Sequence, residues 1–216
     1  MPPARDAPDW DELARIYGRQ VWLERASLRT LLDLLDPGPS DRLLDIATGT
    51  AALPAELATR GSRPREVVGI DRSAKMMRRA PDLPAGWKLE RADATGLPFA
   101  DDSFDLVTVS YLLHLLDRET RSQVIEECAR VLRPGGRIGV ITIAPPRHGV
   151  TAALTAPVRW AAERYPSRLV GLRPLDPGPD LAAGGFTEFS RRRSFRGYPA
   201  LCVVARSRAD SPAEGG

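Results

Sequence analysis

Between residues 42 and 143, short apolar segments that suit β-strands alternate with segments that have helical spacing, and this alternation constrains the fold more than any other feature. Strands are expected at 42–46, 67–70, 87–92, 104–110 and 137–143. Helices are expected at 53–59, at 73–79 with Ser73 as N-cap, and at 118–132. Strands that alternate with helices form right-handed βαβ units around a mostly parallel sheet. The pattern therefore predicts a doubly wound α/β fold.

The segments on either side of this repeat complete the expected architecture. Helical spacing occupies 9–23 and again 24–35, and 186–195 and 201–204 have the composition of two strands joined by a turn. A hairpin there would add antiparallel edge strands and bring the sheet to seven. We expect one domain over 9–208, because 216 residues suit a single domain. Its parts would be a helical cover at 9–36 and an acceptor or lid segment at 144–180, with disordered ends at 1–8 and 209–216.

Composition excludes several classes of protein. No apolar run is long enough to span a membrane, and the first residues lack the apolar core of a signal peptide. Cys128 and Cys202 lie inside apolar patterns, which is typical of buried thiols in the reducing cytoplasm. Neither they nor the two histidines, His114 and His148, have metal-ligand spacing, so no metal site is expected. The net charge is only +3, which gives no reason to expect nucleic-acid binding.

The first strand leads into a turn of small residues and then a helix, in the order Leu-Leu-Asp-Ile-Ala-Thr-Gly-Thr-Ala over 43–51. Small residues let a ligand approach the backbone, and a helix N-terminus offers free N–H groups to an anion. The nicotinamide-dinucleotide fingerprint G-x-G-x-x-G fails here at two of its three glycines, where the chain has Ala47 and Ala52 around Gly49. A tight turn that binds nothing is the other alternative.

Acidic residues follow three successive strands, at Asp45, Asp71 and Asp93. The carboxyl ends of strands in an open α/β sheet are where ligands bind, so the three are expected to face one crevice. Asp71 ends the second strand, where a carboxylate holds a ribose diol, although a turn or N-cap role is also open. Asp93 suits an exocyclic amine such as adenine N6.

Four motifs resemble those of the S-adenosylmethionine-dependent class I methyltransferases, and most closely the ubiquinone and menaquinone C-methyltransferases. They are Leu44-Asp45-x-Ala47-Thr48-Gly49-Thr50, Gly69-Ile70-Asp71-x-Ser73-x-x-Met76, Asp93-Ala94-x-x-Leu97-Pro98-Phe99 with Asp101-x-Ser103-Phe104-Asp105, and Val131-Leu132-Arg133-Pro134-Gly135-Gly136. The resemblance implies a Rossmann-like methyltransferase fold and methyl transfer from S-adenosylmethionine to a C, O or N nucleophile of a small molecule. One departure is that the family's G-x-G-x-G loop has alanine at its first and third glycine positions; we expect Ala51 to keep a negative φ, because a positive one would strain the loop.

The resemblance also implies roles for individual residues around the cofactor. The methionine part would be held by Asp45, which orients the ammonium, and by the loop through Ala47 and Gly49. The nucleoside would be held by Asp71 at the ribose, Arg72 beside the adenine, and Asp93 with the Ala94 amide at the adenine edge. Ser110 would lie near the donor methyl group, and Tyr17 would close over the cofactor.

His114 follows the fourth strand by four residues and is the candidate general base. The alternative, which we favour, is a packed histidine held by a backbone carbonyl. The segment Ser110-Tyr111-Leu112-Leu113 lacks the Asn/Asp-Pro-Pro-aromatic motif of amino-methylating nucleic-acid enzymes, so a small-molecule acceptor is expected. A different class of function also stays open, a module that binds the cofactor without catalysis.

Overall fold

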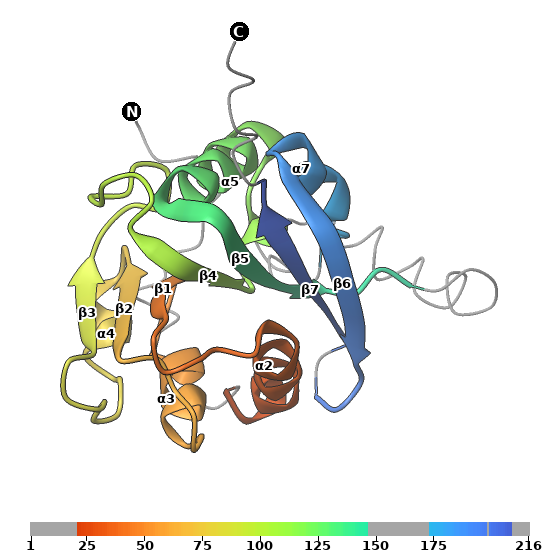
Figure 1. The fold of residues 1–216 in the computed structure, drawn as a ribbon. Helices are drawn as coiled ribbons and strands as arrows, with labels where there is room; N and C mark the ends of the chain where they lie inside the picture. Colours follow the sequence, from red (N-terminus) through yellow and green to blue (C-terminus); the bar gives the residue numbers. More distant parts are fainter. Residues whose placement is uncertain (1–20, 147–172, 198, 209–216) are drawn as a thin grey trace, which may run out of the picture.

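The computed structural model describes residues 21–146, 173–197 and 199–208. Its centre is one seven-stranded sheet in the order β3-β2-β1-β4-β5-β7-β6 (Figure 1). The first five strands are parallel, and β7 is antiparallel to both β5 and β6. The predicted doubly wound sheet with a C-terminal antiparallel hairpin is therefore confirmed.

The elements follow the predicted order closely. The strands are β1 (Arg42–Ile46), β2 (Glu66–Asp71), β3 (Lys88–Arg91), β4 (Phe104–Ser110), β5 (Leu132–Ile143), β6 (Phe186–Ser194) and β7 (Ala200–Ser207). The helices are α2 (Val21–Leu35), α3 (Ala52–Ala58), α4 (Ala74–Met77), the short 3-10 helix η1 (Leu113–Leu115), α5 (Arg118–Val131) and α7 (Gly178–Ala183).

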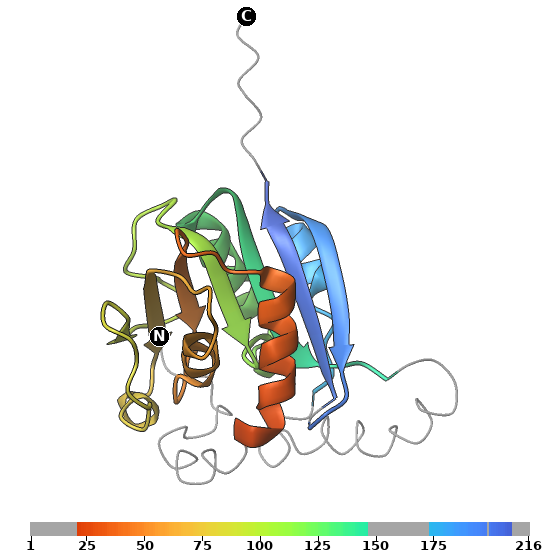
Figure 2. The ribbon, with the colours of Figure 1, turned by 60° about the horizontal axis from the view of Figure 1, so that its bottom comes forward.

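Helices cover both faces of the sheet and enclose two apolar cores. The aliphatic face of α2 packs with α3 against one face, where Leu28, Leu31, Leu32 and Leu35 join Leu53 and Leu57. The opposite face is covered by α5 and α7, with Val124, Ile125, Cys128, Val131 and Leu181 in its core. Figure 2 shows α2 lying in front of the sheet and α5 with α7 behind it. Burial of residues three and four apart on α2 and α5 is the helical period that the sequence displays.

Several helix and strand boundaries differ from the sequence prediction, among them those of α2 and β5. Helix α2 begins at Val21, before the expected position 24. Strand β5 begins at Leu132, so the Pro134–Gly136 segment, expected to be a turn, lies within the strand and beside a register shift in its pairing with β4. Helix α7 was not predicted, because it is one short turn in a segment rich in proline and glycine. The helical spacing predicted over 9–20, residues 147–172 of the predicted acceptor or lid segment, and the disordered ends expected at 1–8 and 209–216 lie outside the described residues.

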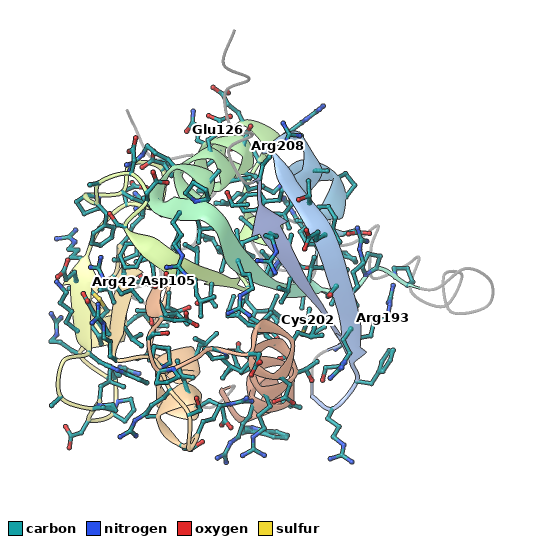
Figure 3. All side chains as sticks on the ribbon, viewed as in Figure 1. Arg42, Asp105, Glu126, Arg193, Cys202 and Arg208 are labelled. Carbon is teal, nitrogen blue, oxygen red and sulfur yellow. The ribbon has the colours of Figure 1, made fainter. Side chains whose placement is uncertain are left out.

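The amino-terminal edge of the sheet is closed by charged groups. The backbone N–H of Arg42 donates to the Asp105 carboxylate at 2.6 Å, and these two residues lie next to each other in Figure 3. The Arg42 guanidinium pairs with Glu66 on β2 at 2.9 Å. This edge is therefore occupied by protein groups, which leaves the opposite edge for a ligand. None of the helices in the described ranges has the length and apolar character needed to cross a membrane.

Leu31 tests the packing of α2 on the sheet. It is fully buried against β5, where a methyl group added at Gly139 would come within 3.2 Å of the leucine side chain. We expect Leu31→Ala to lower the free energy of unfolding by about 2–5 kcal/mol, measured by urea denaturation. Leu34→Ala, at a half-buried position on the same helix, should cost clearly less; equal losses would contradict this packing.

Candidate functional site

A cavity lies at the carboxyl-terminal edge of the parallel strands. Its walls come from the segments that follow β1, β2, β3 and β4, and its described lining residues are Ala47, Gly49, Ile70, Asp71, Arg72, Met76, Ala92, Ala94, Ser110, Tyr111, Leu112 and Leu115. Strand order reverses between β1 and β4, which is the switch point where open α/β sheets bind ligands. The alternation of strands and helices in the sequence thus predicts the edge of the sheet at which this cavity lies.

The loop after β1 has three residues in the left-handed region. Ala47, Gly49 and Ala51 each have a φ of 57°. The expectation that Ala51 keeps a negative φ is therefore wrong. The alanines adopt the conformation that glycine would adopt more easily, at a cost of roughly 1–2 kcal/mol each. Hydrogen bonds hold the loop, since the Thr48 N–H donates to the Ile70 carbonyl at 2.9 Å and the Ala51 N–H to the Thr48 carbonyl at 2.9 Å.

Asp71 ends β2 and its carboxylate bridges two loops. One oxygen accepts from the Gly49 N–H at 2.9 Å, and the other accepts from the Ser73 N–H at 2.8 Å. Ser73 in turn caps α4 by accepting from the Met76 N–H at 3.2 Å, as the sequence predicts. Burial raises the pKa of Asp71, and the backbone hydrogen bonds oppose that rise. Each oxygen keeps a lone pair, so the carboxylate can accept from two further donors in the cavity.

Asp45 lies deeper than the sequence prediction requires. It is 2% exposed and is absent from the described cavity lining, and its carboxylate accepts from the Thr108 hydroxyl at 2.7 Å. Burial raises the pKa of Asp45 to about 6, against the effect of the hydrogen bond from Thr108. A carboxylate in this place can act on a ligand through the loop above it or through water, the indirect form of the expected role.

Of the residues expected at the adenine, the structure brings Arg72 and Ala94 to the cavity. Asp93 is not among the described lining residues. Its carboxylate accepts from the Thr95 N–H at 3.0 Å and the Thr95 hydroxyl at 2.9 Å, and it lies 3.6 Å from the Arg72 guanidinium. Partial burial opposes ionisation, but these contacts hold the pKa of Asp93 below its usual value. Asp93 therefore shapes the loop whose neighbours, Ala92 and Ala94, form the wall.

Ser110 and Tyr111 form the wall at the end of β4. The Ser110 hydroxyl is buried and has no hydrogen-bond partner among the described residues. A buried hydroxyl left without a partner is costly, so this atom is available to a ligand in the cavity. Ser110 thus lines the cavity, and its place near the donor methyl group stays a prediction. Tyr17, the predicted cover residue, lies outside the described part of the chain.

His114 lies behind the wall. It is 5% exposed, is absent from the described lining, and its ring stands edge-on to Tyr111 with centroids 6.2 Å apart. Burial lowers the pKa of His114 to about 4, so the imidazole is neutral at pH 7. The packed histidine expected from the sequence fits this position, but Nδ1 lacks the expected carbonyl partner within the described residues.

Sequence reasoning missed the apolar half of the cavity. Ile70, Met76, Leu112 and Leu115 form it, together with the ring of Tyr111. Met76 was noted only as part of a motif. Leu112 and Leu115 resemble core residues in the sequence, and only their position after a parallel strand at the switch point could have indicated a ligand wall.

Comparison with known proteins agrees with this geometry. Residues 43–136 match a family model described as a methyltransferase domain. The chain is 32% identical over 148 residues to the ubiquinone/menaquinone biosynthesis C-methyltransferase UbiE of Geotalea daltonii, which covers 65% of this chain and 61% of that protein. It is 42% identical over 160 residues to a demethylmenaquinone methyltransferase of Mycobacterium sp. (strain KMS), covering 70% of this chain and 65% of that protein. The chain thus spans less than two thirds of the length of these relatives.

Solved structures share the fold at low sequence identity. A SAM-dependent methyltransferase of Methanosarcina mazei matches with a TM-score of 0.59 at 21% identity, covering 80% of this chain and 94% of that one. The [4+2]-cyclase SpnF matches with a TM-score of 0.65 at 20% identity, covering 86% and 81%. These solved structures therefore share the Rossmann-like fold of this chain, and residues 43–136 match a methyltransferase domain.

The cavity has hydrogen-bond acceptors and an apolar surface that suit the nucleoside part of S-adenosylmethionine. Asp71 offers two acceptor positions suited to a ribose diol, and Ala92, Ala94 and Met76 form an apolar surface suited to a base. Gly49 brings backbone to the wall, where an added Cβ would meet the Met76 methyl group at 3.5 Å. The residues present therefore fit this cofactor.

Asp45 yields a test of the buried charge. A buried acid whose pKa is raised to about 6 binds a proton more tightly in the folded chain, so folding stability falls as pH rises from about 4 to 6. Asp45→Asn keeps an acceptor for Thr108 but cannot ionise. The free energy of unfolding of Asp45→Asn minus that of wild type should therefore be about 1–3 kcal/mol larger at pH 8 than at pH 4. Asp33→Asn, which changes an exposed carboxylate on α2, is the control and should show no such pH dependence. The same pH dependence in Asp33→Asn, or none in Asp45→Asn, would contradict the buried charge at Asp45.

Proposed function

We propose that this chain transfers a methyl group from S-adenosylmethionine to a nucleophilic C, O or N atom of a small molecule. The observation that carries the proposal is the Asp71 carboxylate, which ends β2, accepts two backbone N–H groups and lines the cavity at the carboxyl-terminal edge of the sheet. When bound, the cofactor supplies a sulfonium methyl group, whose bond to sulfur breaks as the bond to the acceptor forms, leaving S-adenosylhomocysteine.

The residues of the chain would bind and align rather than carry protons. Asp71 would hold the ribose, Arg72 and Ala94 would contact the adenine, and Ala47 and Gly49 would lie under the methionine part. Asp45 would orient the ammonium through its fixed position below the loop. Holding two reactants in line can supply most of the rate in such a displacement. Tyr17 remains a proposed cover, as do 9–36 and 144–180 as cover and acceptor segments of a single domain over 9–208.

The acceptor proposed first is the reduced, quinol form of a demethylated quinone, whose electron-rich ring carbon can attack the sulfonium methyl group and then lose its proton to water. One relative is named a ubiquinone/menaquinone biosynthesis C-methyltransferase, and another is named a demethylmenaquinone methyltransferase. We place the reaction in the cytoplasm, which agrees with the two free buried thiols, Cys128 and Cys202. A module that binds the cofactor without catalysis would bind S-adenosylhomocysteine but show no methyl transfer to any acceptor.

The ribose contact yields the first test of the proposal. Calorimetry should detect binding of S-adenosylhomocysteine and none of NAD. Asp71→Ala removes both acceptors and should weaken binding by about 1–3 kcal/mol, as expected for hydrogen bonds to a charged group. Asp33→Ala, a carboxylate on the exposed side of α2, is the matched control and should bind as wild type does. An unchanged dissociation constant in folded Asp71→Ala would place the ribose elsewhere.

The role of His114 is tested by turnover with demethylmenaquinol, the reduced form of demethylmenaquinone, as acceptor. A buried imidazole with a pKa of about 4 is a weak base, so we expect it to act in packing. His114→Phe keeps a ring against Tyr111 and should retain turnover within about threefold. His114→Ala should lose stability and keep its turnover per folded molecule. A drop of about 10²–10⁴-fold in folded His114→Phe would instead identify a general base.

A further inference from the structure

Tyr111 is the cavity residue whose backbone conformation is hardest to maintain. Its φ is 57°, in the left-handed region that bulky side chains avoid. Such strain persists only where the surroundings hold it, and it concentrates at functional sites. The Tyr111 N–H donates to the Ile141 carbonyl of β5 at 2.8 Å, which fixes the backbone. The side chain has its own anchor on a different element.

That anchor is Ser27 on α2. The Tyr111 hydroxyl lies 2.7 Å from the Ser27 hydroxyl, 84 residues away in the sequence. Ser27 is fully buried, and its hydroxyl donates to the Glu24 carbonyl at 2.6 Å. A serine hydroxyl has one hydrogen, so the Tyr111 hydroxyl must be the donor to Ser27. The pair is therefore a directed hydrogen bond from the cavity wall to helix α2.

Ser27 is itself held against the sheet. Its carbonyl accepts from the thiol of Cys202 on β7 at 3.5 Å, and Figure 3 shows Cys202 beside α2. On the other side, the Tyr111 ring stands at 85° to the His114 ring. The backbone, hydroxyl and ring edge of Tyr111 thus each have a different contact, and the hydroxyl contact reaches a helix that contributes no described residue to the cavity lining.

We propose that Ser27 is a positioning residue for the cofactor pocket, which through the Tyr111 hydroxyl holds the tyrosine ring as a fixed wall of the cavity. Helix α2, although it contributes no described lining residue, then helps to set the affinity for the cofactor. Without the hydroxyl contact the ring gains rotational freedom, and a ligand must immobilise it again on binding. The inference rests on the proposed function in that the cavity is taken to bind S-adenosylmethionine.

The test measures the dissociation constant of S-adenosylhomocysteine and urea unfolding for wild type, Tyr111→Phe, Ser27→Ala and the double variant. Each single variant should bind about three- to tenfold more weakly. The double variant should bind no more weakly than either single one, because both changes remove the same contact. Thr30→Ala is the control, since its hydroxyl donates to the Ala26 carbonyl within the same helix. It should bind within twofold of wild type.

The outcomes separate the two proposals. If wild type fails to bind S-adenosylhomocysteine, the proposed function is overturned. If wild type binds and the folded Tyr111→Phe and Ser27→Ala variants bind within twofold of it, the positioning role is overturned, whatever their stability. Additive losses in the double variant would also overturn it, because Ser27 and Tyr111 would then act independently. Unfolding curves supply the folded fraction of each variant, so a loss of stability is not counted as a loss of affinity.

Discussion

The carboxylate of Asp71 is the contact on which the site depends. It accepts one backbone N–H from the loop after β1 and one from the turn that opens α4, so it joins the two loops that frame the cavity. Neither loop has a helix or sheet partner for these N–H groups, and an unpaired buried N–H is costly. The same carboxylate lines the cavity, so one group both joins the two loops and can accept hydrogen bonds from a ligand.

Backbone strain is present in the segments around the cavity, beside these hydrogen bonds. Ala47, Ala51 and Tyr111 are non-glycine residues with positive φ, and all three lie in the segments after β1 and β4. Each costs of order 1–3 kcal/mol, which only a well-packed fold can hold. Two apolar cores, one on each face of the sheet, supply that stability, and they extend to the cavity, since Tyr111 belongs to one core and Ile70 to the other. The cavity can therefore keep conformations chosen for binding.

The sequence allowed much of the fold to be predicted, and the reason is periodicity. The strand at 104–110 and the helix ending near 131 were predicted almost to the residue, because the strand is a continuous buried run of β-prone residues and the helix buries one regular face. Where burial has no simple period, prediction failed. The residue types of the Pro134–Gly136 segment suit a turn. Leu132 and Arg137, on either side of this segment, pair with β4, and Arg137 also pairs with β7, so the segment lies within strand β5. Helix α7 is too short for periodicity to indicate it.

The site, like the fold, could be predicted from the sequence only in part. The sequence by itself determined that small residues and acidic residues follow successive parallel strands, and the structure brings three residues of these segments, Asp71, Gly49 and Ala94, to one cavity. This follows because the carboxyl ends of parallel strands meet at one edge.

Only the tertiary structure decided how deep each carboxylate lies and which residues share a wall. Asp45 is buried beneath the loop, Asp93 turns to Thr95 and Arg72, and Ser27 reaches Tyr111 across 84 positions of sequence. Burial and long-range contacts depend on how α2 and the loops pack onto the sheet, and no local pattern in the chain encodes that packing.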